Sequence, residues 1–263
     1  MVAAAGAGES RARRAWLLPL AVFLLVLAGG QAAVGMRAAA TASVTGDEPF
    51  YLLTTQSLVS DGDLDLRDEY RQREYRRFWD GTIPLWKQME PAPDGRLLSP
   101  HEPGLSVITT PAYAAFGLRG VQRFLVLLWA LAMAGAAVVA RRYGAPVGAA
   151  GFAAVVVGLG PPGIVYASQG YPEGAAALAV VMALLAVTSP RARPLVVSAA
   201  VIGLAWLGIK YSAVGAVLAG AWAWRFRRER RALAIAAGLC ALAGAHYVLC
   251  HLDTFGGLTP YGT

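Results

Sequence analysis

The sequence predicts an all-α, polytopic membrane protein with about seven transmembrane helices, and two observations lead to that prediction. The 263 residues are 57% hydrophobic and only 15% charged, with a mean hydropathy of +0.50, which is too apolar for an ordinary soluble domain. Arginines fall in short clusters between apolar runs, as they do in the cytoplasmic loops of membrane proteins. The net charge of +7 therefore reflects membrane orientation, and we expect no nucleic-acid partner.

Apolar segments predict the transmembrane helices in chain order. The longer segments approach the roughly 20 residues that a helix needs to cross a bilayer. The region 1–36 has the charged and apolar parts of a signal peptide, but further spans follow it, so we expect a cytoplasmic piece at 1–14 and a retained helix at 15–36. A long extracytoplasmic loop at 37–120 precedes a six-helix membrane bundle at 121–252 and a tail at 253–263. The predicted spans are Ala15–Met36, Val121–Ala140, Ala145–Ala167, Gly174–Thr188, Leu195–Ile209, Tyr211–Trp224 and Ala232–Leu252.

The arginine clusters predict the side of the membrane on which each loop lies. With a cytoplasmic N-terminus, the positive-inside rule is satisfied by every basic cluster. These clusters are at 1–14, 141–144, 189–194 and 225–231. A single tilted helix over 195–224 would break this pattern and bury Lys210 in the bilayer at a high cost in free energy, so we prefer two short helices that turn at Lys210. We expect an extracytoplasmic C-terminus and, from the Ala, Gly and Arg richness, a bacterial plasma (inner) membrane.

Two segments of the long loop are ambiguous. The apolar segment 104–118 extends only about 22 Å as a helix, against a hydrocarbon core of about 30 Å, so we expect a re-entrant or interfacial helix. As a full span it would invert every later element. The segment 66–81, "LRDEYRQREYRRFWDG", alternates aromatics with charges. It predicts either an interfacial helix with its aromatics among lipid headgroups or a solvated charged helix.

Two apparent motifs lack the residues that their chemistry needs. Asp61, Asp63 and Asp65 have the spacing of a calcium-binding loop, but leucine replaces the sixth-position glycine and glutamine replaces the twelfth-position glutamate. The segment 158–163, "GLGPPG", matches a dinucleotide-binding fingerprint, but its prolines lack the amides that would hold a phosphate. We expect a kinked helix end there.

Polar clusters that no basic loop explains are all predicted to emerge on the extracytoplasmic side, where they could form one site. They are 46–51, 99–104, 168–174, Lys210–Tyr211 and the terminal tail. The first of them, in "GDEPFYL", carries the adjacent carboxylates Asp47 and Glu48.

This arrangement resembles the GT-C superfamily of membrane glycosyltransferases, especially its protein O-mannosyltransferase and lipid A aminoarabinose transferase branch. The resemblance covers nearly the whole chain, and the order and spacing of short motifs carry it. These motifs are the early Asp-Glu pair, "HEPGL", "FGLRGVQR", "YPEGAAALAV" and "GLAWLGIKYSAV". It implies an inverting hexosyl- or pentosyltransferase that uses a polyprenyl-phosphate sugar donor and an extracytoplasmic acceptor.

The resemblance assigns catalysis to the first-loop carboxylates, with Asp47 as general base and Glu48 beside it. An acceptor hydroxyl must lose its proton as it attacks the anomeric carbon, which a positioned carboxylate can accept. The departing phosphate needs cations, for which Lys210 and Arg123 are candidates. His101 stands where the branch usually has a lysine, which leaves the donor headgroup open. Alternatively, Asp47 caps a helix and Lys210 extends to the headgroups.

Further candidates for binding the donor phosphate are Tyr211, next to Lys210, and Glu173, which could instead stabilise a helix N-terminus. His246 and His251 are expected to be packing or interfacial residues. A divalent metal is possible, with Asp47, Glu48 and His101 as hard ligands. The expected partners are the lipid donor, the bilayer, an unknown acceptor and, if the chain is a truncated copy or a half, a second subunit. The alternatives to an enzyme are a transporter or lipid-binding membrane module and a non-catalytic membrane fragment.

Overall fold

The structure is a computed structural model that describes residues 2–36, 42–92 and 94–260. Over these residues it is all-helical and contains no β-strand, as the sequence predicts. The longer helices are α1 (Val2–Ala33), α4 (Gly104–Arg142), α5 (Val147–Leu159), α7 (Glu173–Val187), α8 (Pro194–Leu207), α9 (Ser212–Arg225) and α10 (Arg230–Phe255). The long loop holds α2 (Glu48–Ser60), α3 (Arg67–Arg71) and the 3₁₀ helix η1 (Glu74–Arg77), and the short elements α6 (Gly163–Ala167) and η2 (Ile209–Tyr211) connect the others.

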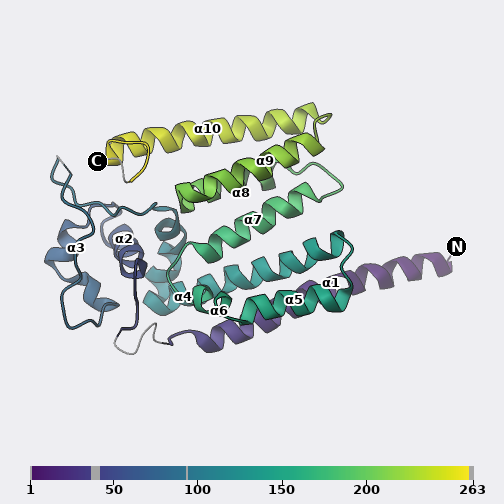
Figure 1. The fold of residues 1–263 in the computed structure, drawn as a ribbon, viewed down its shortest axis with the longest axis horizontal. Coiled ribbons are helices and arrows are strands. Elements are labelled where there is room, and N and C mark those ends of the chain that lie inside the picture. The colour runs from purple at the N-terminus through teal and green to yellow at the C-terminus, as the bar shows by residue number, and fades with distance from the viewer. Residues whose placement is uncertain (1, 37–41, 93, 261–263) are drawn as a thin grey trace.

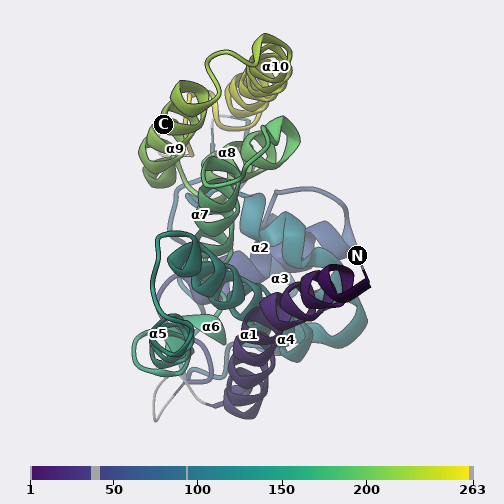
Figure 2. The same cartoon turned by 90° about the vertical axis from the view of Figure 1, so that its right-hand side faces the viewer.

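The long helices run roughly parallel in one row, and α2 and α3 lie across one end of it (Figure 1). Along the row, α1 contacts α4 and α5, α4 contacts α7, α7 contacts α8, and α8 contacts α9 and α10 (Figure 2). The chain therefore has a helical bundle and a separate layer at the end where α2 lies.

Three helices are long and apolar enough to cross a membrane, and their hydrophobic parts are in α1 (Trp16–Ala33), α4 and α10. Helices α5, α7 and α8 are apolar but shorter than a bilayer core requires. The prediction of seven full spans is therefore not confirmed. The predicted span 145–167 shows why: Pro161 and Pro162 have no amide hydrogen, so α5 ends at Leu159 and α6 starts after the prolines, as expected for a kinked helix end.

Helix α4 is interrupted near its start. Gly117 has φ of 58° and ψ of −150°, a conformation that glycine adopts without strain and that does not continue a helix. A Cβ atom at Gly120 would lie 2.1 Å from the carbonyl oxygen of Ala112, so the chain folds tightly on itself at this break. The part before the break, 104–116, is about 20 Å long, too short to cross a bilayer. This agrees with the expectation of a short helix before the span.

The aromatic segment of the long loop differs from both predictions made for it. The helix breaks between α3 and η1, where Arg73 has a positive φ of 58°. Tyr75, Phe78 and Trp79 are buried in the protein core and do not face lipid headgroups or solvent. A pattern of alternating aromatic and charged residues does not specify whether lipid or protein covers the aromatic side chains, and here α2 supplies the covering surface.

Helix α2 is the centre of this layer, and its residues 48–57 are all buried. Phe50, Leu52 and Leu53 belong to the same hydrophobic core as Leu105 and Leu125 of α4, so the core continues from the layer into the bundle. Burial of several large apolar side chains, each worth about 1.5–3 kcal/mol, holds α2 in place. The two acidic residues at its start are thereby fixed relative to the helices below.

Candidate functional site

The polar clusters predicted to emerge on one side do come together at one end of the bundle. The loop before α7 contacts the start of α2, because the amide of Gly170 donates a hydrogen bond to Glu48 Oε1 at 2.8 Å. The tail joins the long loop where Arg96 donates to the carbonyl oxygen of Asp253 at 3.2 Å. At the other end, Arg142 donates to the carbonyl oxygen of Leu185, in the region of the basic clusters. The structure therefore separates the acidic and the basic loops to opposite ends, as the arginine pattern predicts.

Asp47 lies immediately before α2 with its side chain 54% exposed. Its carboxylate does not cap the helix, which removes the capping alternative for this side chain. Its Oδ1 accepts a hydrogen bond from Gln88 Nε2 at 3.2 Å and lies 3.7 Å from His101 Nε2. Asp47 is thus held from one side while part of its carboxylate faces solvent.

Glu48 has the opposite environment, since it is fully buried. Its Oε1 accepts the hydrogen bond from Gly170, and its Oε2 accepts one from the amide of Thr45 at 3.3 Å. Burial raises the pKa of Glu48 to about 7, against the opposing effect of these two hydrogen bonds. The two adjacent carboxylates are therefore different chemically: one is exposed, and the other joins two loops.

The contact between these loops is close. Tyr171 donates its hydroxyl hydrogen to the carbonyl oxygen of Thr45 at 2.9 Å. Gly46 has a positive φ of 57°, and a Cβ atom there would lie 2.3 Å from the Tyr171 hydroxyl oxygen. Only glycine fits both the backbone conformation and the space at this position.

His101 is the residue that connects Asp47 to the rest of the site. Its ring stacks on Tyr51, with centroids 4.6 Å apart, and its Nε2 is buried without a hydrogen-bond partner. Burial lowers the pKa of His101, the charge of Asp47 raises it, and the charge of Lys210 lowers it further. The charges of Asp47 and Lys210 therefore have opposite effects on the protonation of this ring, and Asp47 is the one that contacts it.

Lys210 lies in η2, at the turn between α8 and α9 that the sequence predicts. Its Nζ is 3.1 Å from Glu173 Oε1, and it lies 5.0 Å from the centre of the Tyr211 ring. The Lys210 side chain is 64% exposed, so it remains accessible to a ligand. Burial, followed by the charge of Glu173, raises the pKa of Tyr211, which keeps its hydroxyl group neutral.

Arg123 is the one predicted site residue that the structure does not connect to this group. It is exposed on α4, and its backbone carbonyl oxygen accepts a hydrogen bond from Gln31 of α1 at 3.2 Å. Within the described part of the chain, no hydrogen bond or ion pair joins its guanidinium group to Asp47, His101 or Lys210.

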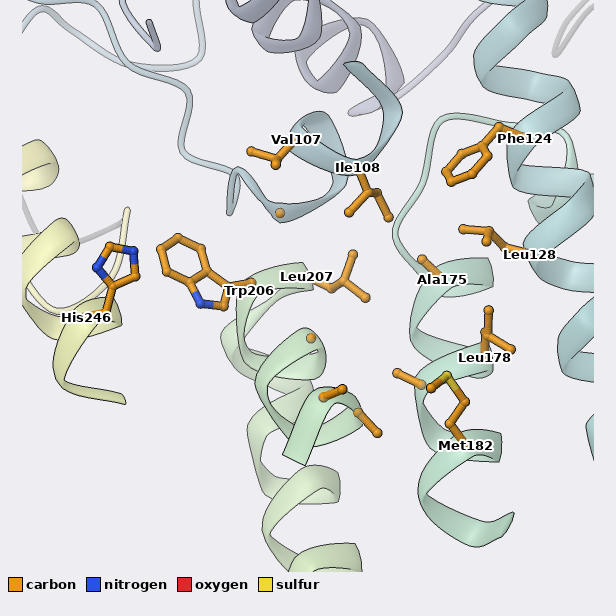
Figure 3. Close-up of a pocket in the computed structure, with 15 residues that line it drawn as sticks. Val107, Ile108, Phe124, Leu128, Ala175, Leu178, Met182, Trp206, Leu207 and His246 are labelled. Carbon is orange, nitrogen blue, oxygen red and sulfur yellow. The ribbon is translucent and has the colours of Figure 1, made fainter. Parts of the chain in front are cut away.

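A cavity of about 640 Å³ lies directly beneath this polar region, between the start of α4, α7 and α8, with His246 of α10 at one edge (Figure 3). Apolar side chains line it, among them Ile108, Leu178 and Met182. Three of the lining helices lead to a site residue within three positions along the chain: Gly104 follows His101, Ala175 follows Glu173, and Leu207 precedes Lys210. The lining of the cavity is therefore continuous along the chain with the segments that carry His101, Glu173 and Lys210.

The structure also contains a buried polar group that sequence reasoning missed. Glu102, on the loop before α4, accepts a hydrogen bond from the Tyr247 hydroxyl at 2.6 Å and contacts His251 Nε2 at 2.8 Å. His251 Nδ1 is 2.9 Å from the carbonyl oxygen of Tyr247, so it must carry a hydrogen, and the contact with Glu102 requires one more proton. His251 was expected to serve in packing or at the interface. It is buried and stacks on Tyr247, and it also ties α10 to the loop that carries His101.

Asp47, Glu48 and His101 are not a group whose ligand atoms converge among the described residues, and Glu48 accepts hydrogen bonds from Gly170 and Thr45. The calcium-loop spacing also fails, as the sequence indicates. Asp63 accepts a hydrogen bond from Ser57, and Asp65 forms an ion pair with Arg67. Across the described ranges, the three acidic or metal-ligating side chains that do converge are Asp61, Asp68 and Glu69.

No protein-family model, curated protein or solved structure matches this chain significantly.

Proposed function

We propose that the protein is a membrane glycosyltransferase of the GT-C type, which moves a sugar from a polyprenyl-phosphate donor to an acceptor outside the cytoplasm. The observation that carries the proposal is the combination at one end of the bundle: an exposed carboxylate, an accessible lysine and an apolar cavity whose lining leads to both. A lipid-linked sugar needs these three features, for its acceptor, its phosphate and its hydrocarbon chain.

Asp47 acts as the general base. Both of its protein contacts involve Oδ1, which leaves Oδ2 for an acceptor hydroxyl. The acceptor oxygen forms a bond to the anomeric carbon as its proton passes to Asp47, and the bond from that carbon to the phosphate oxygen breaks with its electrons. The sugar is transferred with inversion, and the polyprenyl phosphate leaves as an anion.

Lys210 receives that anion. A lysine ammonium group has three N–H donors, and Glu173 uses one of them, so two can reach a phosphate. Glu173 holds the lysine in place, and the Tyr211 ring lies beside its ammonium group. Glu48 positions the two loops through Gly170, and the hydrocarbon chain of the donor occupies the apolar cavity.

The first experiment measures binding of a polyprenyl-phosphate sugar and of the sugar-free polyprenyl phosphate to the full chain in detergent. We expect tighter binding of the glycosylated lipid. Lys210→Ala should weaken both affinities about tenfold or more, since a charge-assisted hydrogen bond is worth about 1.5–3 kcal/mol. Lys87→Ala removes the chain's other lysine, which is exposed in the long loop and contacts Tyr70, and should change neither affinity.

The second experiment tests catalysis. Asp47→Asn should abolish sugar transfer while donor binding and the melting temperature stay near those of the original protein. Glu90→Gln, which changes an exposed acid in the same loop, serves as the control. If donor binding depends on Lys210 but the original protein transfers no sugar, the protein is a lipid-binding module. If Asp47→Asn transfers sugar as fast as the original protein, Asp47 is not the general base. Absence of binding to either lipid would refute the proposal.

A further inference from the structure

The carboxylates of Asp61, Asp68 and Glu69 converge at the far end of α2 from the candidate catalytic residues. One ligand oxygen from each lies within 4.8 Å of the corresponding oxygen of the other two. Asp61 directly follows the C-terminus of α2, and Asp68 and Glu69 lie in the first turn of α3. Three negative charges this close repel one another unless a cation or protons compensate them.

The burial of Glu69 is a second and independent observation. Its side chain is 1% exposed, and Oε2 is buried with no hydrogen-bond partner. A buried carboxylate oxygen without a partner carries a large desolvation penalty, which proteins normally offset with a hydrogen bond, an ion pair or a metal. Among the described residues no basic side chain forms an ion pair with Glu69, because the nearby Arg67 pairs with Asp65.

The position of Asp61 also favours a cation. The C-terminus of a helix carries a partial negative charge, so a carboxylate there is unfavourable unless a positive ion lies beside it. Gly62, with a φ of 77°, turns the chain sharply after α2 and brings the loop back towards α3. Asp61 is exposed, which leaves a path for an ion and room for water ligands.

We propose that Asp61, Asp68 and Glu69 bind a calcium ion, which joins the C-terminus of α2 to α3. The three ligand oxygens lie within 4.8 Å of one another, so an ion between them would be about 2.8 Å or less from each oxygen. This is close to the calcium–oxygen distance of about 2.3–2.6 Å. Magnesium, at about 2.0–2.1 Å, would require larger movements and a stricter octahedral geometry. All three ligands are hard oxygen donors, which calcium prefers over the nitrogen and sulfur ligands typical of zinc.

The ion would stabilise the layer that carries the candidate site. Helix α2 has Asp47 and Glu48 at its start and the three-carboxylate cluster at its end, so calcium would fix the end that the hydrogen bond to Gly170 does not hold. The proposal does not depend on the glycosyltransferase assignment, because binding of calcium can be measured without any sugar lipid.

The test is a titration of the full chain in detergent with calcium chloride, followed by calorimetry and by the melting temperature. We expect a Kd of about 10⁻⁴–10⁻³ M, as for calcium sites in extracellular modules. At a calcium concentration ten times Kd, the melting temperature should rise by about 3–5 °C. Magnesium chloride should produce a smaller rise at the same concentration.

Two variants locate the site. Asp61→Asn changes an exposed ligand and should weaken calcium binding at least tenfold, whereas Glu90→Gln, an exposed acid elsewhere in the loop, should leave Kd unchanged. Glu69→Gln should abolish the calcium-dependent rise in melting temperature, because it replaces the buried carboxylate ligand with an amide. The proposal would be overturned if calcium at ten times the highest expected Kd produced neither binding heat nor a rise in melting temperature. It would also be overturned if Asp61→Asn and the original protein responded equally to calcium. If Glu69→Gln does not fold, Asp61→Asn decides the question.

Discussion

The buried carboxylate of Glu48 predicts a specific dependence of stability on pH. Its pKa is about 7 in the folded protein, against 4.5 for a glutamate exposed to water in the unfolded chain. The folded state therefore holds its proton over a pH range in which the unfolded state has lost it. Stability decreases as pH rises wherever the folded state binds more protons, so the decrease falls between pH 4.5 and 7.

The size of this effect follows from the difference in pKa. A difference of about 2.5 units, at 1.36 kcal/mol per unit, corresponds to about 3 kcal/mol. For a chain of this size that is roughly 6–12 °C in the melting temperature. The loss of stability due to Glu48 is absent below pH 4.5 and complete above pH 7.

The assay compares the melting temperatures of the original protein and Glu48→Gln in detergent from about pH 4.5 to 8. Glutamine cannot ionise, so the difference between the two melting temperatures should change by this amount across the interval. Burial raises the pKa of Glu69 to about 8 in both proteins. Its titration therefore changes both melting temperatures equally and does not affect the difference between them. Glu90→Gln should follow the original protein. Parallel curves for Glu48→Gln and the original protein would show that Glu48 does not hold its proton as the structure requires.

Three other predictions follow from particular contacts. His251→Ala leaves Glu102 Oε2 buried without its hydrogen-bond partner and should destabilise the fold by about 1–3 kcal/mol, whereas His246→Ala on the same helix should cost less; similar melting temperatures would contradict the pairing. Gly46→Ala should destabilise the fold by about 1–3 kcal/mol more than Gly62→Ala and lower the melting temperature further, because both residues have positive φ but only Gly46 lacks space, beside Tyr171. For topology, cysteines at Asp47 and Glu90 should react with an impermeant thiol reagent applied outside the cell, and one at Tyr143 should not; labelling at Tyr143 would reverse the proposed orientation.

Much of the architecture follows from local signals in the sequence. Apolar runs predict the helices, and the arginine clusters predict which helix ends share a side, because both depend on the solvent that each segment meets. The turn at Lys210 is predicted correctly for the same reason, since a lysine in mid-bilayer is too costly. The seven predicted full spans are not confirmed. In the predicted span 145–167, Pro161 and Pro162 end α5 early, which hydropathy alone does not detect.

The candidate site is predictable only in part. Asp47, Glu48, His101, Glu173 and Lys210 were selected from motif order, and the structure brings them to one end of the bundle. Their separate chemical roles were not predictable, because adjacent residues at a helix start differ in burial according to which loop packs over them. Gln88, which contacts Asp47, has no signal in the sequence at all.

The sequence by itself determined that this chain is helical, that it is suited to a membrane and that its acidic and basic loops lie at opposite ends. These properties come from composition and periodicity, which act locally along the chain. The tertiary structure decided which polar groups meet: Glu48 with Gly170, Glu102 with His251, and Asp61 with Asp68 and Glu69. Such contacts depend on how helices distant in sequence pack together, and the free energy of a buried carboxylate depends on the partner that this packing supplies.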